Sequence, residues 1–452
     1  MHQIKRFHYL TKAGSYSSLL VVLLSAAHGI AMASTKAVVD FPTLPEVTTI
    51  NNNTVTLSTD LYVYKCDDAD CSTKTQLDDY GHVTNVHRWP KSSGGPGGTP
   101  PATWIFLSLT ENLAQYFEFW QEVDTEWQSC ILAIADDGSL APTQTTCVGI
   151  SQIAQPAAAN VPHFSMSAAM FQNAESRSDP SPSNINALPA RSLTFVNATS
   201  ASKICLQTDS SFEHEACSGA KIIPQASPYV INASHLWEGL NSEVAQVVAY
   251  QTKPGEWVDT GRDKANLVYA TNLEATIWPE QDQFTVGPTT IDVSLVNGFN
   301  VGVSLVPDRD TVCAIADTEG GKPYFVLYEA DMPMAIFPKS AHATLNDVCP
   351  TENISPDSSG LDTGCYSSCS YAQKIHGINS DAADQACCAA QYHSVPACTL
   401  PPTLPYVQNI DSNSERVYSW AFEDWRGTFT CEASASFAFE LINPPLNPPP
   451  GQ

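Results

Sequence analysis

The stretch that decides the fold runs from Ile291 to Val301 and reads IDVSLVNGFNV. Apolar and polar residues alternate over its first half, which predicts a β-strand with one face toward a core. Asn297-Gly298 tolerates positive φ, so it predicts a turn, and Phe299 then returns the chain to the core. The stretch therefore predicts a strand that carries a carboxylate, Asp292, and ends in a tight turn.

The rest of the chain is typical of a mostly β protein. Val55–Tyr64 and Phe325–Tyr328 also alternate, and the 32 prolines and 23 glycines punctuate the sequence throughout. Only Glu111–Gln128 and Asp381–Tyr392 have a pattern that predicts helices. We therefore expect β-rich modules with little helix.

Composition narrows the classes of partner. The chain has 452 residues, with 21 Lys and Arg against 47 Asp and Glu, so its formal charge is 21 − 47 = −26. A charge of this sign repels phosphate backbones and anionic lipids, which argues against nucleic acid or a membrane surface as the main partner. Only 15% of residues are charged, below the roughly 25% of an average domain. A surface built from uncharged polar residues favours an exported, strand-rich protein.

The first 33 residues predict a signal peptide. Lys5 and Arg6 precede the apolar run Leu19–Leu24, and Ala31–Ala33 forms a small-x-small site, so we expect cleavage near Ala33. A membrane span needs about 20 apolar residues, and this run is shorter. The sequence thus predicts a secreted or extracellular protein, periplasmic if bacterial, without a membrane span. In such a compartment the 14 cysteines indicate disulfides.

A Pro/Ser-rich stretch divides the mature chain. Residues 179–189 predict a linker between a smaller β-rich module of unknown family, residues 34–178, and a larger module, residues 190–442; residues 443–452 form a proline-rich tail. The first module has an aromatic-rich segment, for which core packing is favoured over a sugar-stacking platform. Its aromatic residues are Trp104, Tyr116, Phe117, Phe119, Trp120 and Trp127.

Two further motifs follow the opening stretch. Gly364-Cys365 begins a cysteine-rich segment that extends to Cys398, and residues 418–431 read YSWAFEDWRGTFTC. In this order, the three motifs resemble those of thaumatin-like proteins over about residues 190–442. The resemblance implies a thaumatin-like β-sandwich with a disulfide-rich subdomain.

The resemblance also implies a register for the cysteines. It pairs Cys313 with Cys431, Cys349 with Cys365, Cys369 with Cys387, and Cys388 with Cys398. Proximity in sequence suggests pairs for the other six cysteines, namely Cys66 with Cys71, Cys130 with Cys147, and Cys205 with Cys217.

Thaumatin-like proteins carry an acidic cleft, and some of them bind or hydrolyse β-1,3-glucan. The resemblance places Glu274, Asp292 and Asp424 at three of its acidic positions, while Asn297 occupies the fourth. It also implies an arginine within Ala245–Lys253, where none occurs. We expect the catalytic residues to be Glu274 and Asp292, and the substrate-binding residues to be Asn297, Phe299, Glu423 and Asp424.

Glycoside hydrolysis requires one protonated and one ionised carboxyl group beside the scissile bond. Glu274 as general acid and Asp292 as base or nucleophile supply these residue types for an endo-β-1,3-glucanase. Because Asn297 and the missing arginine remove charges that would separate the two pKa values, binding is favoured over hydrolysis. Asp292 as a structural turn residue stays an alternative.

The sequence thus predicts a secreted, monomeric protein of the defence type that binds, and in the enzyme case hydrolyses, the β-1,3-glucan polysaccharide of a cell wall. We expect no metal and no cofactor. The alternative is a non-catalytic inhibitor or structural wall protein that uses the disulfide scaffold as an interaction platform.

Overall fold

The computed structural model describes most of the chain after residue 35. The described residues are 36–41, 47–50, 53–76, 103–110, 113–124, 126–156, 159–167, 175–177, 192–207, 217, 221–225, 227–232, 243–277, 289–316, 323–432 and 435–445. The expected signal peptide and linker lie outside these residues, so both stay predictions, as do the module boundaries. No helix in the described part of the chain has the length and apolar character needed to cross a membrane.

The N-terminal module consists of two sheets. One has the order β5 (Thr103–Ser108), β1 (Lys36–Phe41), β9 (His163–Ser165), β8 (Ser151–Ile153). The other has the order β10 (Glu175–Arg177), β7 (Glu126–Ile134), β6 (Gln115–Val123), β3 (Asn53–Cys66), β2 (Val47–Ile50), with β4 (Lys74–Gln76) on β3. A hydrophobic core that includes Val39, Leu107, Phe117 and Phe119 joins them.

The helix expected over Glu111–Gln128 is wrong, because this segment forms β6, a turn and the start of β7. The apolar residues Phe117, Phe119 and Val123 are spaced by even numbers, so they share one face of a strand and are all buried. Asp124 takes a positive φ of 48° in the turn between the two strands. Trp104 and Trp120 are also buried, which agrees with core packing of the aromatic segment.

The larger module is a sandwich of two sheets around one core. The five-stranded sheet has the order β14 (Tyr229–Asn232), β11 (Ser192–Asn197), β27 (Phe437–Ile442), β20 (Gly302–Pro307), β23 (Ala335–Phe337). The nine-stranded sheet has the order β13 (Lys221–Pro224), β12 (Lys203–Gln207), β15 (Glu243–Lys253), β17 (Asn272–Ile277), β18 (Thr289–Ser294), β26 (Phe429–Cys431), β21 (Thr311–Ala316), β22 (Pro323–Tyr328), with β16 (Glu256–Asp259) on β15. The expectation of a mostly β sandwich is confirmed.

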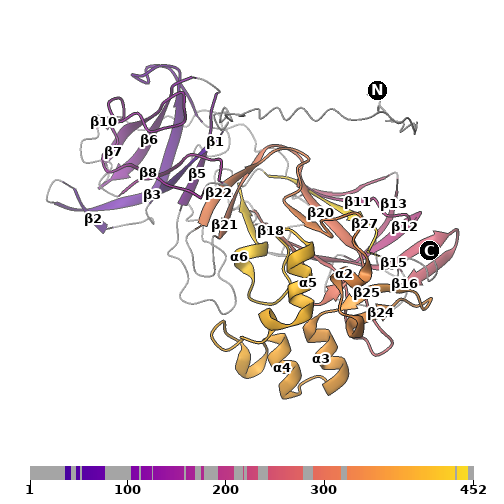
Figure 1. Ribbon diagram of the computed structural model, residues 1–452. Helices are drawn as coiled ribbons and strands as arrows, with labels where there is room; N and C mark the ends of the chain where they lie inside the picture. Colours follow the sequence, from indigo (N-terminus) through magenta and orange to yellow (C-terminus); the bar gives the residue numbers. More distant parts are fainter. Residues whose placement is uncertain are drawn as a thin grey trace, which may run out of the picture. The chain divides into compact units, whose positions relative to one another are not determined.

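Residues 345–413 form the cysteine-rich region, where the helices gather (Figure 1). It contains α2 (Leu345–Val348), β24 (Ile354–Pro356), β25 (Asp362–Tyr366), α3 (Ser368–His376), α4 (Asp381–Cys387) and α5 (Pro405–Asn413), and it pairs through β25 with β19 (Gly298–Phe299). Of the predicted Asp381–Tyr392 helix, the first half is α4. Cys388 ends that helix with a positive φ of 55°.

All 14 cysteines form disulfides, in the seven pairs that the sequence suggested. Four of the seven bridges lie in the sandwich module between Cys313 and Cys431. The bridge between Cys313 and Cys431 joins β21 to β26 at directly opposite positions of the sheet. The cysteine register is therefore confirmed.

Candidate acidic site

Glu274 and Asp292 face each other across two neighbouring strands. They are direct partners in the antiparallel pairing of β17 with β18. Their neighbours Leu273 and Val293 point into the sandwich core, so the two carboxyl groups project from the opposite, outer face of the sheet. Directly opposite residues place their Cβ atoms about 4.5–5.5 Å apart. Both residues are half-buried, and the Oδ1 atom of Asp292 is fully buried, so the register brings the two predicted carboxyl groups together on a face that is only partly accessible.

A row of polar side chains holds Glu274 in place. Asn272 donates from Nδ2 to Glu274 Oε1 at 3.1 Å, and its own Oδ1 accepts a hydrogen bond from Gln246. Burial raises the pKa of Glu274, while hydrogen bonds from Asn272 and Ser294 lower it. Glu274 thus has donors that stabilise its ionised form.

Asp292 has the opposite surroundings. Burial, and then the charges of Glu274 and Asp424, raise the pKa of Asp292 well above its ordinary value. Its buried Oδ1 makes no hydrogen bond with any part of the chain that the structure describes. Because Glu274 keeps its donors, a proton shared by the pair is held more firmly on Asp292.

Tyr418 connects Asp424 to this pair. The Tyr418 hydroxyl donates to Asp424 Oδ1 and is also hydrogen-bonded to Thr428, the residue that follows α6 (Asp424–Gly427). Tyr418 is anchored beside β18, since its N–H donates to the Val293 carbonyl at 3.0 Å. The charges of both Asp292 and Asp424 raise the pKa of Tyr418, after the larger effect of burial. The structure therefore brings Glu274, Asp292 and Asp424 into one acidic cluster.

Glu423 is placed differently from expectation. Its side chain is 1% exposed, and its Oε2 accepts hydrogen bonds at 2.7 Å from both the N–H and the hydroxyl of Ser419. Its Oε1 lies 3.9 Å from the Arg426 guanidinium. With so little exposed surface, Glu423 braces the segment that carries Asp424 and does not reach a ligand, contrary to the substrate-binding role expected from the sequence.

Arg426 is a cation of this region that the sequence reasoning missed. Its Nη1 lies 2.6 Å from Asp411 Oδ1 and 3.0 Å from the Val417 carbonyl, and its Nη2 donates to the Ser414 carbonyl at 3.3 Å. The sequence feature that could have identified this cation is the arginine within the YSWAFEDWRGTFTC motif. Its position in the fold depends on Asp411 in the last turn of α5 and on Ser414 just after that helix, 15 and 12 residues away.

We expect Glu423→Gln to flatten the dependence of stability on pH. Burial, followed by the charge of Asp411, raises the pKa of Glu423 from 4.5 to about 7. Because the pKa of Glu423 is higher in the folded protein, the protonated group adds about 3 kcal/mol to the free energy of unfolding below pH 4.5. This contribution is lost as the pH rises to 7. Urea unfolding at pH 4.5, 6 and 8 measures it. Glu256→Gln, at an exposed site, is the control, and an unchanged slope in Glu423→Gln would contradict the expectation.

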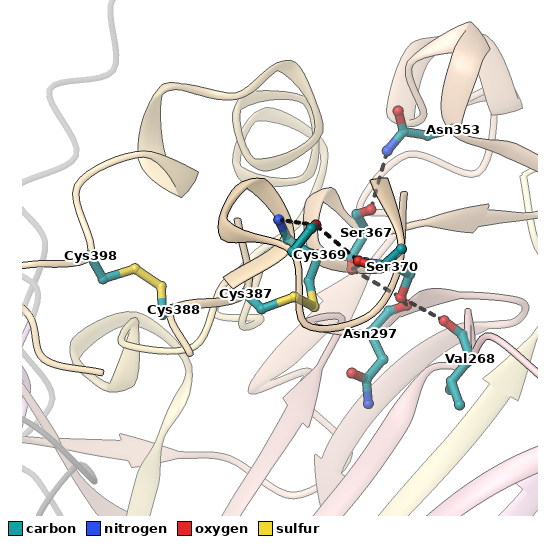
Figure 2. Close-up of a disulfide and its surroundings, with 12 residues drawn as sticks. Val268, Asn297, Asn353, Ser367, Cys369, Ser370, Cys387, Cys388 and Cys398 are labelled. Carbon is teal, nitrogen blue, oxygen red and sulfur yellow. Dashed lines mark hydrogen bonds between the residues drawn. A yellow bond between two sulfur atoms is a disulfide. The ribbon is translucent and has the colours of Figure 1, made fainter. Parts of the chain in front are cut away.

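The two predicted ligand contacts in the turn after β18 have different positions. Phe299 is completely buried with its ring 4.7 Å from that of Phe337, so it offers no surface to a ligand and its expected substrate-binding role is not supported. Asn297 is partly exposed, and its carbonyl accepts a hydrogen bond at 2.9 Å from the Ser370 hydroxyl, which also donates to Val268 (Figure 2).

The cysteine-rich region borders the site at this turn. Figure 2 shows Ser367 and Ser370 at the start of α3, beside the disulfide between Cys369 and Cys387. A small hollow lies there, lined by Val296, Ser367, Ser368, Cys369, Ala386, Cys387, Pro401, Ser419, Trp420 and Ala421. Within the residues that the structure places, no three His, Cys, Asp or Glu side chains gather in a way that would hold a metal ion.

Comparison with known proteins covers this part of the chain. Residues 263–442 match the model of the Thaumatin family, and no family model matches the N-terminal module. The chain is 30% identical over 152 residues to a "Glucan endo-1,3-beta-glucosidase" of Prunus avium, a match that covers 34% of this chain and 48% of that protein. It is also 30% identical over 145 residues to "Thaumatin-like protein 1" of Pyrus pyrifolia, covering 32% and 46%. The chain thus spans about half the length of these relatives.

Proposed function

We propose that the protein is exported and binds the β-1,3-glucan of a cell wall through the face that carries Glu274, Asp292 and Asp424, because residues 263–442 match the model of the Thaumatin family. The observation that carries the proposal is the direct pairing of Glu274 with Asp292 on a partly exposed sheet face. Carboxylate oxygens on such a face accept hydrogen bonds from sugar hydroxyls, and amide side chains both accept hydrogen bonds from them and donate hydrogen bonds to them. The name of the Prunus avium relative supports a β-1,3-glucan as the ligand.

The seven disulfides support an extracellular location, since such bonds persist in oxidising compartments. The expected signal peptide agrees with it. An oxidised, compact scaffold suits a protein that works at a cell wall, in a role such as defence.

The pair also has the residue types for hydrolysis. Retaining glycosidases hold their two carboxyl groups about 5–5.5 Å apart, and the cross-strand pairing is compatible with that separation. The surroundings favour Asp292 as the proton donor, because burial without a hydrogen-bond donor at Oδ1 favours its neutral form. Glu274, with donors from Asn272 and Ser294, is then the ionised partner. These roles are the reverse of those expected from the sequence.

Two substitutions test binding and hydrolysis separately. We expect Glu274→Gln to reduce the release of reducing ends from laminarin by at least 100-fold, because the anionic partner is lost, while affinity for insoluble β-1,3-glucan changes less than about threefold. Asp292→Asn should give the same loss, because it removes the proton donor.

The wild-type protein decides between the alternatives. If it binds glucan but releases no reducing ends, the function is binding alone. If the oxidised protein neither binds glucan nor cleaves it, the glucan proposal is overturned, and the inhibitor or structural wall protein remains.

A further inference from the structure

Two rows of side chains cross the outer face of the large sheet at the acidic site. In the first row, Val244 of β15 pairs with Glu274 of β17, and Glu274 pairs with Asp292 of β18. The second row lies two residues away on each strand, where Asn272 pairs with Ser294. Residues two apart on a strand share a face, so the second row lies directly beside the acidic pair.

The second row consists of uncharged polar residues. Gln246 follows Val244 by two positions on β15 and therefore lies on the same face as Asn272. At the other end of the row, Ser294 forms an isolated bridge with Tyr418. The four residues Gln246, Asn272, Ser294 and Tyr418 are 3%, 7%, 5% and 8% exposed. The row is therefore nearly closed to water and depends on protein groups for its hydrogen bonds.

The hydrogen bonds in this row run in one direction. Gln246 donates from Nε2 to Asn272 Oδ1, and Asn272 donates from Nδ2 to Glu274 Oε1 at 3.1 Å. A carboxamide carries its donors on one side and its acceptor on the other, so the partner on one side decides what the other side presents. Because Gln246 offers a donor, the Asn272 oxygen faces Gln246 and the Asn272 NH₂ group faces Glu274.

Reversal of Asn272 alone is unfavourable while Gln246 is in place. It would bring two NH₂ groups together between the amides and place the Asn272 oxygen against the carboxyl group of Glu274. Since both amides are almost completely buried, water cannot readily supply the missing partners, and each unpaired group would keep its desolvation cost. Gln246 therefore holds Asn272 in the orientation that stabilises ionised Glu274.

Asp292 receives no comparable donor. Its buried Oδ1 makes no hydrogen bond with any of the residues that the structure places, and burial followed by the charges of Glu274 and Asp424 raises the pKa of Asp292. The Tyr418 hydroxyl, at the end of the second row, donates to Asp424. A hydrogen bond from Ser294, by contrast, lowers the pKa of Glu274. The row thus favours the charged form of Glu274 over that of Asp292.

The charged groups around Glu274 do not replace these donors. β18 contributes Asp292 and α6 contributes Asp424, and both are acidic. Arg426, also on α6, is ion-paired with Asp411. The side of the pair that faces β15 meets two residues that do not titrate, the valine and the glutamine of the two rows. In the described part of the site, the ionisation of Glu274 therefore depends on the neutral second row.

We propose that Gln246 is a positioning residue for the acidic pair, because its bond to Asn272 turns the donor of that amide toward Glu274 and thereby makes Glu274 the ionised member. This inference rests on the proposed function, in which hydrolysis needs one ionised and one protonated carboxyl group. Gln246 acts through Asn272 and is not itself a catalytic residue. It assigns the roles of two carboxyl groups that the strand register only brings together.

Carbon-13 NMR of the fully oxidised protein tests the inference without any glucan. The glutamate carboxyl carbons are labelled, and the Glu274 signal is identified as the one lost in Glu274→Gln. Because Glu274 and Asp292 titrate as a pair, the measured quantity is the midpoint of the Glu274 signal in a pH titration. We expect Gln246→Met, which fills similar space without a donor, to raise the pKa of Glu274, so that its ionisation constant falls at least about threefold.

A double-mutant cycle shows whether Gln246 acts through Asn272. Asn272→Leu alone should lower the ionisation constant of Glu274 by at least about tenfold, and adding Gln246→Met should lower it no further. Gln251→Met is the matched control, since Gln251 also lies on β15 and is 5% exposed, and it should leave the Glu274 midpoint unchanged. An unchanged midpoint in folded Gln246→Met, or additive effects in the cycle, would overturn the inference.

A second variant covers the case in which Gln246→Met does not fold. Gln246→Asn keeps a buried amide, but it is one methylene shorter and cannot reach Asn272 in the same way. Near-ultraviolet circular dichroism checks that its packing is retained. We expect the same fall in the ionisation constant of Glu274, and a folded Gln246→Asn protein with the wild-type midpoint would overturn the inference.

The pH dependence of hydrolysis separates this inference from the proposed function. If the protein releases reducing ends from laminarin, the acidic limb of kcat/KM should move to higher pH in Gln246→Met by the same factor as the NMR midpoint, while affinity for insoluble β-1,3-glucan changes less than about threefold. An acidic limb that stays in place would overturn the positioning role. A wild-type protein that releases no reducing ends, but whose Glu274 midpoint moves as expected, would overturn hydrolysis and support the role of Gln246.

Discussion

Replacing Gly298 with alanine is expected to lower the free energy of unfolding by about 4 kcal/mol or more, or to prevent folding. Gly298 has a φ of 111°, a conformation that side chains rarely adopt, and it pairs with Tyr366 where β19 joins the cysteine-rich region. An added Cβ would lie 2.1 Å from the Cys365 carbonyl oxygen and 3.0 Å from the Ser367 nitrogen. Both are backbone atoms, so the two segments must separate. Denaturant unfolding of the oxidised protein measures the loss.

Gly255→Ala is the matched control. Gly255 also has a positive φ, 80°, but an added Cβ would meet no atom within 4 Å. Its substitution should therefore cost only the backbone strain, about 1 kcal/mol. If both variants lose the same free energy of unfolding, the close approach of the Cys365 carbonyl does not contribute to the cost of the Gly298 substitution, which would contradict the expectation.

Phe325→Ala is expected to lower the free energy of unfolding by about 3–5 kcal/mol, the usual cost of removing a buried phenylalanine. The ring fills the centre of the contact between the N-terminal module and the large sheet, against Trp104 and His163. The Phe325 ring belongs to the core of the N-terminal module, while the Phe325 backbone belongs to β22 of the larger module. The loss of stability should therefore appear in both modules at once. Near-ultraviolet circular dichroism and hydrogen exchange in β1 and β18 follow the two modules during denaturant unfolding.

Ile378→Ala is the control for an apolar truncation, since Ile378 is 62% exposed and should change stability by less than about 0.5 kcal/mol. Two separate unfolding transitions in the wild-type protein, with only the first affected by Phe325→Ala, would contradict the fixed attachment of the module.

The helical expectation for Glu111–Gln128 shows where sequence patterns fail. The residues Asn112, Leu113, Phe117 and Trp120 fit a helical face, yet β6, which forms the middle of this segment, pairs with β3. Phe117 and Phe119 share the inner face of a strand, whereas Trp120 lies on the other face and is also buried. A strand with bulky residues on both faces loses its simple alternation, so its period does not distinguish it from a helix.

The site was only partly predictable for a similar reason. The identities of Glu274, Asp292 and Asp424 follow from the resemblance to thaumatin-like proteins. The roles of Phe299 and Glu423 do not, because whether a side chain near a motif is exposed depends on tertiary packing, such as the contact of Phe299 with Phe337 of β23. Which carboxyl group keeps the proton likewise depends on donors from Asn272 and Ser294.

The sequence by itself determined the β class through local alternation, and proximity in sequence suggested three of the seven disulfides, while the other four disulfides and the acidic positions followed from the resemblance to thaumatin-like proteins. Only the tertiary structure decided that Glu274 faces Asp292 and that the N-terminal module packs on β21 and β22 of the same sheet. Both facts come from strand registers and packing between residues far apart in the chain. The continuous apolar run Ile105–Leu107 indicates a strand that is buried on both faces, but it does not identify the residue that packs against Phe106, here Phe325.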